Sequence, residues 1–136
     1  MKTRIVVTAV IKKGNLLLFG RKPVGVEPYP NTLHLLGGGI KQESESTEED
    51  LRREIREEAG IEVRNLHKIG FDEDYEPDKH GETTHYLFLQ YETDYERGEP
   101  KAGDDITALE WHDKRELPTL ALNRPSKKMF KKMGWL

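Results

Sequence analysis

One segment of the chain combines glycines with a dense group of carboxylates. Residues 37–61 read GGGIKQESESTEEDLRREIREEAGI. Within this segment Glu54, Glu57 and Glu58 recur at helical spacings of three and four residues, where like charges destabilise a helix rather than support it. Carboxylate oxygens suit hard divalent cations, and magnesium is commonly held by a few of them together with substrate phosphates. The spacing therefore predicts a cation beside this helix.

The glycines that precede the helix have a matching use. Without a Cβ, residues 37–39 allow backbone groups to approach a ligand or a metal closely. Glycines that lead into a carboxylate-bearing helix predict metal-assisted chemistry on a phosphate compound. Each half of the pattern also has an ordinary interpretation, because glycine runs mark turns and charged helix faces are usually solvated. We expect the solvated interpretation to hold for Glu48, Glu49 and Asp50.

The sequence defines the helix that must position these carboxylates. Ser46, followed by acidic residues in the first turn, fits a capping box at its start. Gly60 fits the left-handed position just past its end. Leu51, Ile55 and Ala59 recur every four residues and form the predicted buried stripe. The three carboxylates then lie on a face displaced from that stripe, along its edge.

Apolar and β-branched runs elsewhere predict the strands that hold this helix in place. They are Arg4–Ile11, Leu16–Phe19, Thr32–Leu36, Ile61–Phe71, His85–Tyr91 and Ile106–Trp111. Pro23–Pro30 is predicted as a binding loop, and Asp72–Glu82 as an acidic, turn-rich loop. Asn123 caps a predicted final helix with Pro125 in its first turn. The basic residues of that helix are expected to face solvent while its apolar residues pack inward.

Composition limits the class of protein. With 136 residues, 35% apolar and 35% charged, the chain is expected to form a single domain over residues 1–136. The net charge of -3 argues against a nucleic-acid partner. Without cysteine there is no disulfide and no thiolate zinc site. No apolar run reaches transmembrane length, so no membrane partner and a cytoplasmic location are expected.

The spacing of the segment also carries a family resemblance. Gly39, five residues, Glu45, seven residues and then REIREEAGI at residues 53–61 match the Nudix box at every defining position. That box reads G, five, E, seven, R-E-U-x-E-E-x-G-U, where U is aliphatic. The resemblance implies an α/β fold of the Nudix type, an α/β/α sandwich around a mixed central sheet. It also implies hydrolysis of a nucleoside diphosphate linked to another moiety, with Mg²⁺ or Mn²⁺ as cofactor.

The resemblance also assigns roles within the box. Glu57 and Glu58 are implied to be the principal metal ligands. Glu54 is implied to be a further ligand or the general base. Arg53 is implied to orient the glutamates by pairing with Glu45 or Glu57.

Two further contributions to the site are expected outside the helix. A carbonyl of Gly38 or Gly39 is implied to complete the metal shell, and these glycines also border the bound substrate. Family members often draw another carboxylate from a loop before a late strand that ends in tryptophan. Asp104 and Asp105 precede such a strand here, and Asp105 is the expected extra ligand or base.

The expected substrate contacts rest on looser patterns. Asn123 falls near the place of a base-reading asparagine in MutT-like relatives, although capping the final helix is an equally good role for it. Arg21 is expected to contact phosphate or base. Tyr29 is expected to stack on a base or to be an exposed loop aromatic. His34, in a strand-like segment, is expected to line the groove.

Three functions remain open at this point. The chain resembles the small nucleoside-triphosphatase branch, which implies hydrolysis of a nucleoside or deoxynucleoside triphosphate to monophosphate and pyrophosphate. The alternative is a nucleotide-sugar or ADP-ribose pyrophosphatase, which the short chain, without the extra N-terminal domain of many ADP-ribose enzymes, makes less favoured. A non-catalytic nucleotide sensor on the same fold is the third. A small-molecule nucleotide is the expected partner, and the protein is expected to be a monomer or a homodimer.

Overall fold

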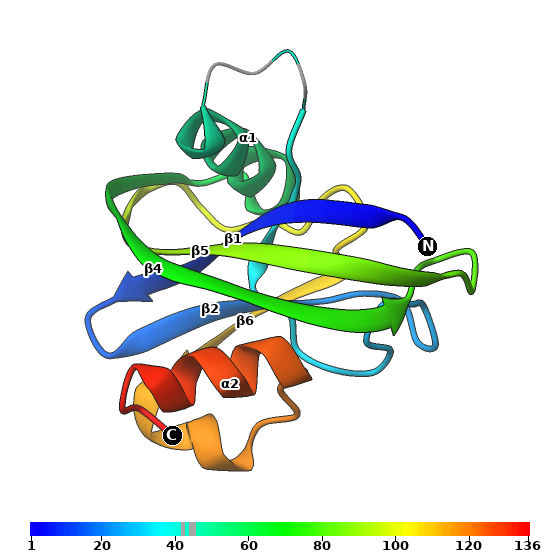
Figure 1. The fold of residues 1–136 in the computed structure, drawn as a ribbon. Helices are drawn as coiled ribbons and strands as arrows, with labels where there is room; N and C mark the ends of the chain where they lie inside the picture. The colour runs from blue at the N-terminus through cyan, green and yellow to red at the C-terminus, as the bar shows by residue number, and fades with distance from the viewer. Residues whose placement is uncertain (42, 44–45) are drawn as a thin grey trace.

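The computed structural model describes residues 1–41, 43 and 46–136 of the chain. Its centre is a mixed sheet in the order β4-β5-β1-β2-β6, with β3 also paired to β1. The strands are β1 (Thr3–Lys13), β2 (Leu16–Arg21), β3 (Leu36–Gly39), β4 (Glu62–Pro77), β5 (Thr83–Arg97) and β6 (Ala108–Asp113). Helix α1 (Thr47–Ala59) covers one face, while the 3-10 helix η1 (Lys114–Thr119) and helix α2 (Arg124–Lys132) cover the other (Figure 1). The predicted α/β/α sandwich is confirmed.

Strand β1 separates the two layers of the core. Its side chains alternate between the faces of the sheet, as side chains in any strand do. Val7 belongs to the buried cluster under α1, together with Leu51 and Ile55 from that helix. Val10 belongs to the second cluster, together with Phe130 from α2. One parallel pairing with β5 and antiparallel pairings with β2 and β3 fix β1 in the middle of the sheet.

Helix α1 begins and ends where its caps predict. The Ser46 Oγ accepts a hydrogen bond from the Glu49 N–H at 3.1 Å, and Gly60 ends the helix with φ of 66°. Glu48 and Glu49 are exposed, as expected. The same expectation for Asp50 is wrong, because this residue is 2% exposed. Its carboxylate accepts hydrogen bonds from the Lys41 N–H and from Arg53, which compensate for its burial.

Strands β4 and β5 are longer than predicted and absorb most of the segment expected as an acidic loop. Pairing continues through Pro77 and Thr83. Asp72 is buried on the α2 side of β4, and Lys128 and Lys132 of that helix pair with it. These partners explain why an acidic residue tolerates this buried strand position, and both lysines remain exposed to solvent, as expected.

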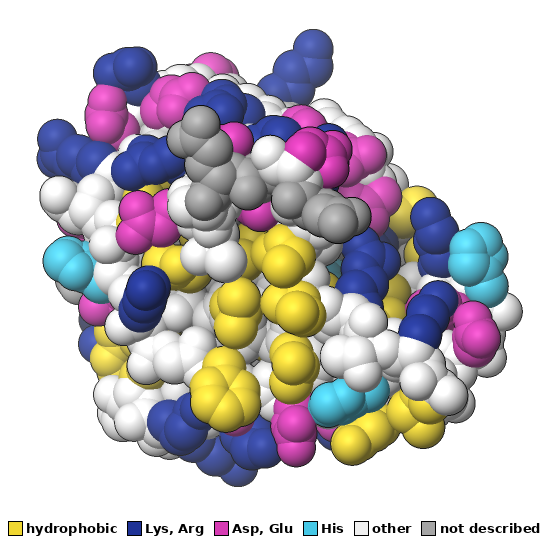
Figure 2. Space-filling view, turned by 45° about the horizontal axis from the view of Figure 1, so that its top comes forward, with side chains coloured by type: hydrophobic (Ala, Val, Ile, Leu, Met, Phe, Trp, Pro, Cys, Tyr) yellow, Lys and Arg dark blue, Asp and Glu magenta, His cyan; other side chains and the backbone are white. Residues whose placement is uncertain are grey.

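Helix α1 covers only part of its face of the sheet. Ile5, Phe71 and Tyr75 lie on the rest of that face, and each has an exposed side chain. Figure 2 shows hydrophobic side chains gathered on the surface, with charged residues around them. In the part of the chain that the structure describes, no helix is both long enough and apolar enough to span a membrane.

Candidate active site

The glycines of residues 37–39 form most of β3, a strand rather than the turn that glycine runs usually mark. This strand pairs antiparallel with β1, so that Gly38 lies opposite Val7. A Cβ on Gly37 would lie 1.9 Å from the Val7 carbonyl oxygen, and a Cβ on Gly38 would lie 2.5 Å from the Glu54 carboxyl carbon. The absence of side chains therefore allows the C-terminal half of α1 to lie directly against main chain.

Glu58 is the most enclosed carboxylate of the predicted set. It is 5% exposed, and its Oε1 accepts a hydrogen bond from the Gly37 N–H at 2.8 Å. Burial raises the pKa of Glu58 to about 9, and the nearby charges of Asp105 and Glu54 act in the same direction. A cation beside this group would favour its ionised form.

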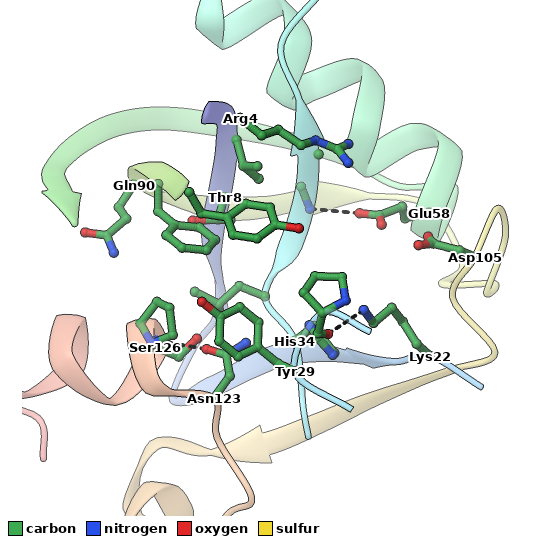
Figure 3. A pocket seen from close by; sticks show the side chains of 18 of the residues that line it. Arg4, Thr8, Lys22, Tyr29, His34, Glu58, Gln90, Asp105, Asn123 and Ser126 are labelled. Carbon is green, nitrogen blue, oxygen red and sulfur yellow. Dashed lines mark hydrogen bonds between the residues drawn. The ribbon is translucent and has the colours of Figure 1, made fainter. Parts of the chain in front are cut away.

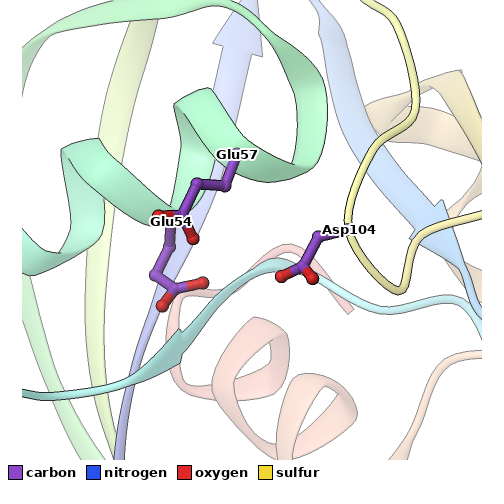
Figure 4. A group of neighbouring side chains, drawn as sticks. All are labelled: Glu54, Glu57 and Asp104. Carbon is purple, nitrogen blue, oxygen red and sulfur yellow. The ribbon is translucent and has the colours of Figure 1, made fainter.

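A second group of carboxylates lies closer to solvent. Glu54, Glu57 and Asp104 place one oxygen each within 4.8 Å of one another (Figure 4). Burial raises the pKa of Glu54, whereas Glu57 and Asp104 are exposed. A donor set made only of carboxylate oxygens fits a hard divalent cation such as Mg²⁺ or Mn²⁺.

The carboxylate that joins Glu54 and Glu57 is thus Asp104, whereas sequence reasoning selected its neighbour Asp105. Asp104 adopts φ of 54°, and this left-handed conformation cannot be read from the sequence. Asp105 instead lines both cavities of the site, as Glu58 does. The signal in the sequence was the pair of adjacent aspartates before β6. One of them, Asp104, joins the carboxylate group, and the other, Asp105, lines the cavities.

Arg53 connects the carboxylates of α1. Its guanidinium donates to Asp50 and to Glu54, each at 2.9 Å, and lies 3.6 Å from Glu57. These contacts agree with the orienting role expected for it, with Asp50 as an additional partner. The hydrogen bonds that Arg53 donates to Asp50 and Glu54 raise the pKa of Arg53, so the group keeps its charge. Its other expected partner, Glu45, lies outside the described residues.

Two connected cavities meet at the carboxylates. The first, of about 160 Å³, lies on the α2 side of the sheet, and Figure 3 shows its lining side chains. The second, of about 340 Å³, contains Glu54, Glu58, Asp104 and Gly39 in its wall. The residues that line both are Arg4, Lys22, Pro28, Gly37, Gly38, Glu58, Tyr86 and Asp105. A ligand with an uncharged ring and a charged chain could extend from one to the other.

The first cavity combines aromatic rings with a few polar groups. Tyr86 and Phe88 of β5 stack with ring centres 5.8 Å apart. Tyr29 also lines the cavity and is 5% exposed, so the expectation of an exposed loop aromatic is wrong. His34 lines it too, and burial lowers the pKa of its imidazole to about 4, so the ring is neutral at neutral pH. The Asn123 Oδ1 caps α2 by accepting from the Ser126 N–H at 3.0 Å.

The cationic side chains where the two cavities meet are not the Arg21 expected from the sequence. Arg21 pairs with Glu110 of β6 and is absent from the described lining of either cavity. The neighbouring Lys22 lines both, and its Nζ donates to the Pro28 carbonyl oxygen at 2.7 Å. Arg4 also lines both, and its guanidinium lies close to Gly39. For Arg4 the available signal was the alternation along β1, which places it on the same face of the sheet as Val6 and Thr8.

Comparison with known proteins agrees with this geometry. The family model of the NUDIX domain matches residues 2–133. The chain belongs to the Nudix hydrolase family. A solved MutT Nudix hydrolase from Burkholderia pseudomallei superposes with a TM-score of 0.80 at 22% identity, covering 96% of this chain and 98% of that one.

Two curated relatives of this Nudix hydrolase are 32% identical to it. One is the NAD-capped RNA hydrolase NudC of Pseudomonas entomophila, matched over 85% of this chain and 38% of the relative. The other is the ADP-ribose pyrophosphatase of Methanocaldococcus jannaschii, matched over 88% of this chain and 67% of the relative. The chain thus spans well under half of the NudC relative.

Proposed function

We propose that this Nudix hydrolase cleaves the pyrophosphate bond of a nucleoside diphosphate joined to a second moiety, with Mg²⁺ or Mn²⁺ as cofactor. The observation that carries the proposal is the position of Glu58. It lies where an aromatic cavity meets a group of carboxylates, so a nucleoside in the first cavity extends its phosphates into the second.

The carboxylates divide the metal-dependent work. Glu54, Glu57 and Glu58 would hold the divalent cation, with Asp104, Asp105 and a Gly39 carbonyl completing the set. A cation held there would supply positive charge beside the phosphates and would lower the pKa of a water molecule bound to it. Glu54 is also the candidate general base, because its carboxylate lies with those of Glu57 and Asp104 where the cation and its water would be held. Arg53 orients Glu54 through the 2.9 Å hydrogen bond.

The aromatic cavity holds the nucleobase. Phe88, Tyr86 and Tyr29 offer ring faces for stacking. Because the Asn123 Oδ1 is engaged in the cap, the amide nitrogen of that residue is the group left to donate to the base. Lys22 and Arg4, at the junction of the two cavities, contact the phosphates.

Two substrate classes fit this arrangement. A nucleoside triphosphate is favoured by the three cations Arg4, Lys22 and Lys79 around the second cavity, since a triphosphate carries the higher charge. ADP-ribose, or the NAD moiety of an NAD-capped RNA, is favoured by the activities for which the two curated relatives are named. The expectations of a small-molecule partner and of no nucleic acid stay predictions.

A substrate panel tests the proposal. Purified protein with Mg²⁺ is incubated with dCTP, dTTP, 8-oxo-dGTP, ADP-ribose, NAD and GDP-mannose, and products are separated by chromatography. One class should yield a nucleoside monophosphate. Tight binding measured by calorimetry, without any product at saturating Mg²⁺, would support a sensor and contradict the proposal.

Substitution of the metal ligands is the first specific prediction. Glu57→Gln and Glu58→Gln should each lower kcat by about 10²-fold or more, because each removes a charge that holds the cation. Glu48→Gln is the matched control, since Glu48 is an exposed glutamate of the same helix, and its activity should equal that of the wild type. Wild-type rates in both site variants would mean that the metal assignment is wrong.

A further inference from the structure

One wall of the first cavity depends on a residue in an unusual backbone conformation. Tyr29 lies in the loop of residues 22–35, between β2 and β3, and its φ is 53°. This left-handed region is uncommon for a bulky side chain, and such a conformation persists only where the surroundings hold it. The contacts that hold Tyr29 therefore also fix the cavity wall.

Those contacts come from two carboxylates of β4. The Tyr29 hydroxyl donates to the Asp74 Oδ2 at 2.7 Å, and the Tyr29 N–H donates to the Glu76 Oε2 at 3.2 Å. Burial and the hydrogen bond to Asp74 raise the pKa of the Tyr29 phenol, so it stays protonated as a donor. Asp74 and Glu76 are two residues apart on one strand and share a face, so their charges repel each other.

Arg124, the first residue of α2, supplies the opposite charge. It donates through Nε to the Asp74 Oδ2 at 3.1 Å and through Nη2 to the Glu76 Oε1 at 2.6 Å. Its guanidinium carbon also lies 5.3 Å from the centre of the Tyr29 ring, within the range of a cation–π contact. One arginine thus contacts the ring and both carboxylates that hold it.

The position of Arg124 separates it from the reacting groups. It is absent from the described lining of both cavities, and its side chain is 61% exposed. It directly follows Asn123, which caps α2 and lines the first cavity. Arg124 therefore joins two walls of that cavity, one from the 22–35 loop and one from α2, from outside the cavity.

We infer that Arg124 is a positioning residue that acts through Tyr29 and sets the affinity of the first cavity for the nucleoside part of the substrate. This inference rests on the proposed function. Because Tyr29 lies beside the nucleoside and not beside the reacting phosphates, loss of Arg124 weakens the binding of the substrate and of the transition state equally. Such a loss raises KM and leaves kcat unchanged.

The kinetic test compares two arginines. Arg124→Gln should raise KM about tenfold, which corresponds to about 1.4 kcal/mol, with kcat unchanged. Arg124→Lys, which keeps the charge, should recover part of this loss. Arg115→Gln is the matched control, because Arg115 of η1 pairs with Asp113 at the end of β6 and its side chain is 90% exposed. Its KM should equal that of the wild type. A fall in kcat without a change in KM would overturn the inference.

A double-mutant cycle tests whether the effect passes through Tyr29. In a Tyr29→Leu background, Arg124→Gln should add less than about twofold to KM, because the ring it positions is gone. A full additional tenfold rise would mean that Arg124 contacts the substrate itself. Tyr29→Phe, which retains the ring and loses only the hydroxyl, should raise KM less than Arg124→Gln does. Unchanged KM in both Tyr29 variants would likewise overturn the inference.

Binding without catalysis separates this inference from the proposed function. Calorimetry with adenosine and cytidine monophosphates, without metal, should show about tenfold weaker binding to Arg124→Gln than to the wild type. Mn²⁺ binding should be equal in the two proteins. Equal monophosphate affinities, or no monophosphate binding to the wild type, would overturn the inference whatever the substrate panel yields. A panel without product, combined with weaker binding to the variant, would overturn only the proposed function.

Discussion

The acidic side chains at the site differ in their surroundings. Glu58 is buried against the Gly37 N–H, whereas Glu57 and Asp104 face solvent. Burial penalises the charged form of Glu58 and raises its pKa to about 9. The exposed carboxylates attract a cation, and the ionised form of the buried Glu58 is stabilised most when that cation binds.

A residue-scale prediction concerns His34. Burial, and then the charge of Lys22, lower the pKa of His34 to about 4 from the ordinary 6.5. Between these values the unfolded chain binds more protons than the folded one, so His34 makes stability fall as pH drops from 6.5 towards 4. In NMR titrations its imidazole signals should stay in the neutral form down to about pH 5.

The comparison protein for that experiment is His34→Asn. Its free energy of unfolding should depend less on pH across the same window, because the titrating group is gone. An imidazole in the wild type that titrates at its ordinary pKa would contradict the enclosed position of His34.

At the scale of elements, β1 supports both layers of the site. Val7 and its alternate neighbours pack under α1, while Val6 and Thr8 line the first cavity. Strand β3 pairs with this same stretch through its glycines. The helix that carries the carboxylates and the first cavity are therefore fixed to opposite faces of one strand.

The close approach of β3 to β1 gives an element-scale prediction. Gly37→Ala should lower the free energy of unfolding by about 3 kcal/mol, because its Cβ would lie 1.9 Å from the Val7 carbonyl oxygen. Gly14→Ala is the control, since a Cβ there meets open space and only its φ of 60° opposes the change. That control should lose about 1 kcal/mol. Urea denaturation measures both, and equal losses would argue against the close approach.

The elements that local patterns define were predictable from sequence. The stripe Leu51, Ile55 and Ala59, with Ser46 and Gly60 as caps, predicted α1 to within a residue. The resemblance to the Nudix box then predicted the α/β/α sandwich, because the spacing of that box is tied to one fold. Local periodicity and a fixed motif are both contained within a single stretch of chain.

Features that depend on partners from other elements were not predictable. Asp50 looked like a solvated first-turn residue, yet Lys41 and Arg53 enclose it. Tyr29 looked like one more loop aromatic, because its partners Asp74 and Arg124 lie 45 and 95 residues away along the chain. Long-range packing, rather than composition, decides such positions.

At the scale of the whole molecule, charge is distributed along the path that a substrate would take. The aromatic end of the first cavity is closed by Tyr29, Phe88 and the start of α2, and the second cavity brings carboxylates and cations together. Metal binding and folding are linked in such a site, because ligands that are separate in the unfolded chain converge only in the folded one.

Metal addition therefore gives a whole-molecule prediction. With Mg²⁺ or Mn²⁺ at about 100 times its Kd, the free energy of unfolding should rise by about 2.7 kcal/mol. Because the pKa of Glu58 is raised to about 9, the folded chain without metal binds more protons than the unfolded chain between about pH 4.5 and 9, and its stability falls as pH rises there. Metal binding favours the ionised form of Glu58, so at a fixed metal concentration its stabilising effect should grow with pH.

Thermal unfolding with and without metal measures this effect, independently of any activity. Glu58→Gln should lose most of the metal-dependent stabilisation, and Glu48→Gln should retain it. A stabilisation of equal size in both variants would place the cation elsewhere.

Strand β3 has one more consequence. Its glycines supply main chain only, so this wall of the site carries no side chain that could discriminate one ligand from another. Side chains that line the first cavity stand instead on the 22–35 loop, on β5 and at the start of α2. Under the proposed function these elements would select the nucleotide, and exchanging the loop and the helix start would be the route to redirecting the chain toward a new one.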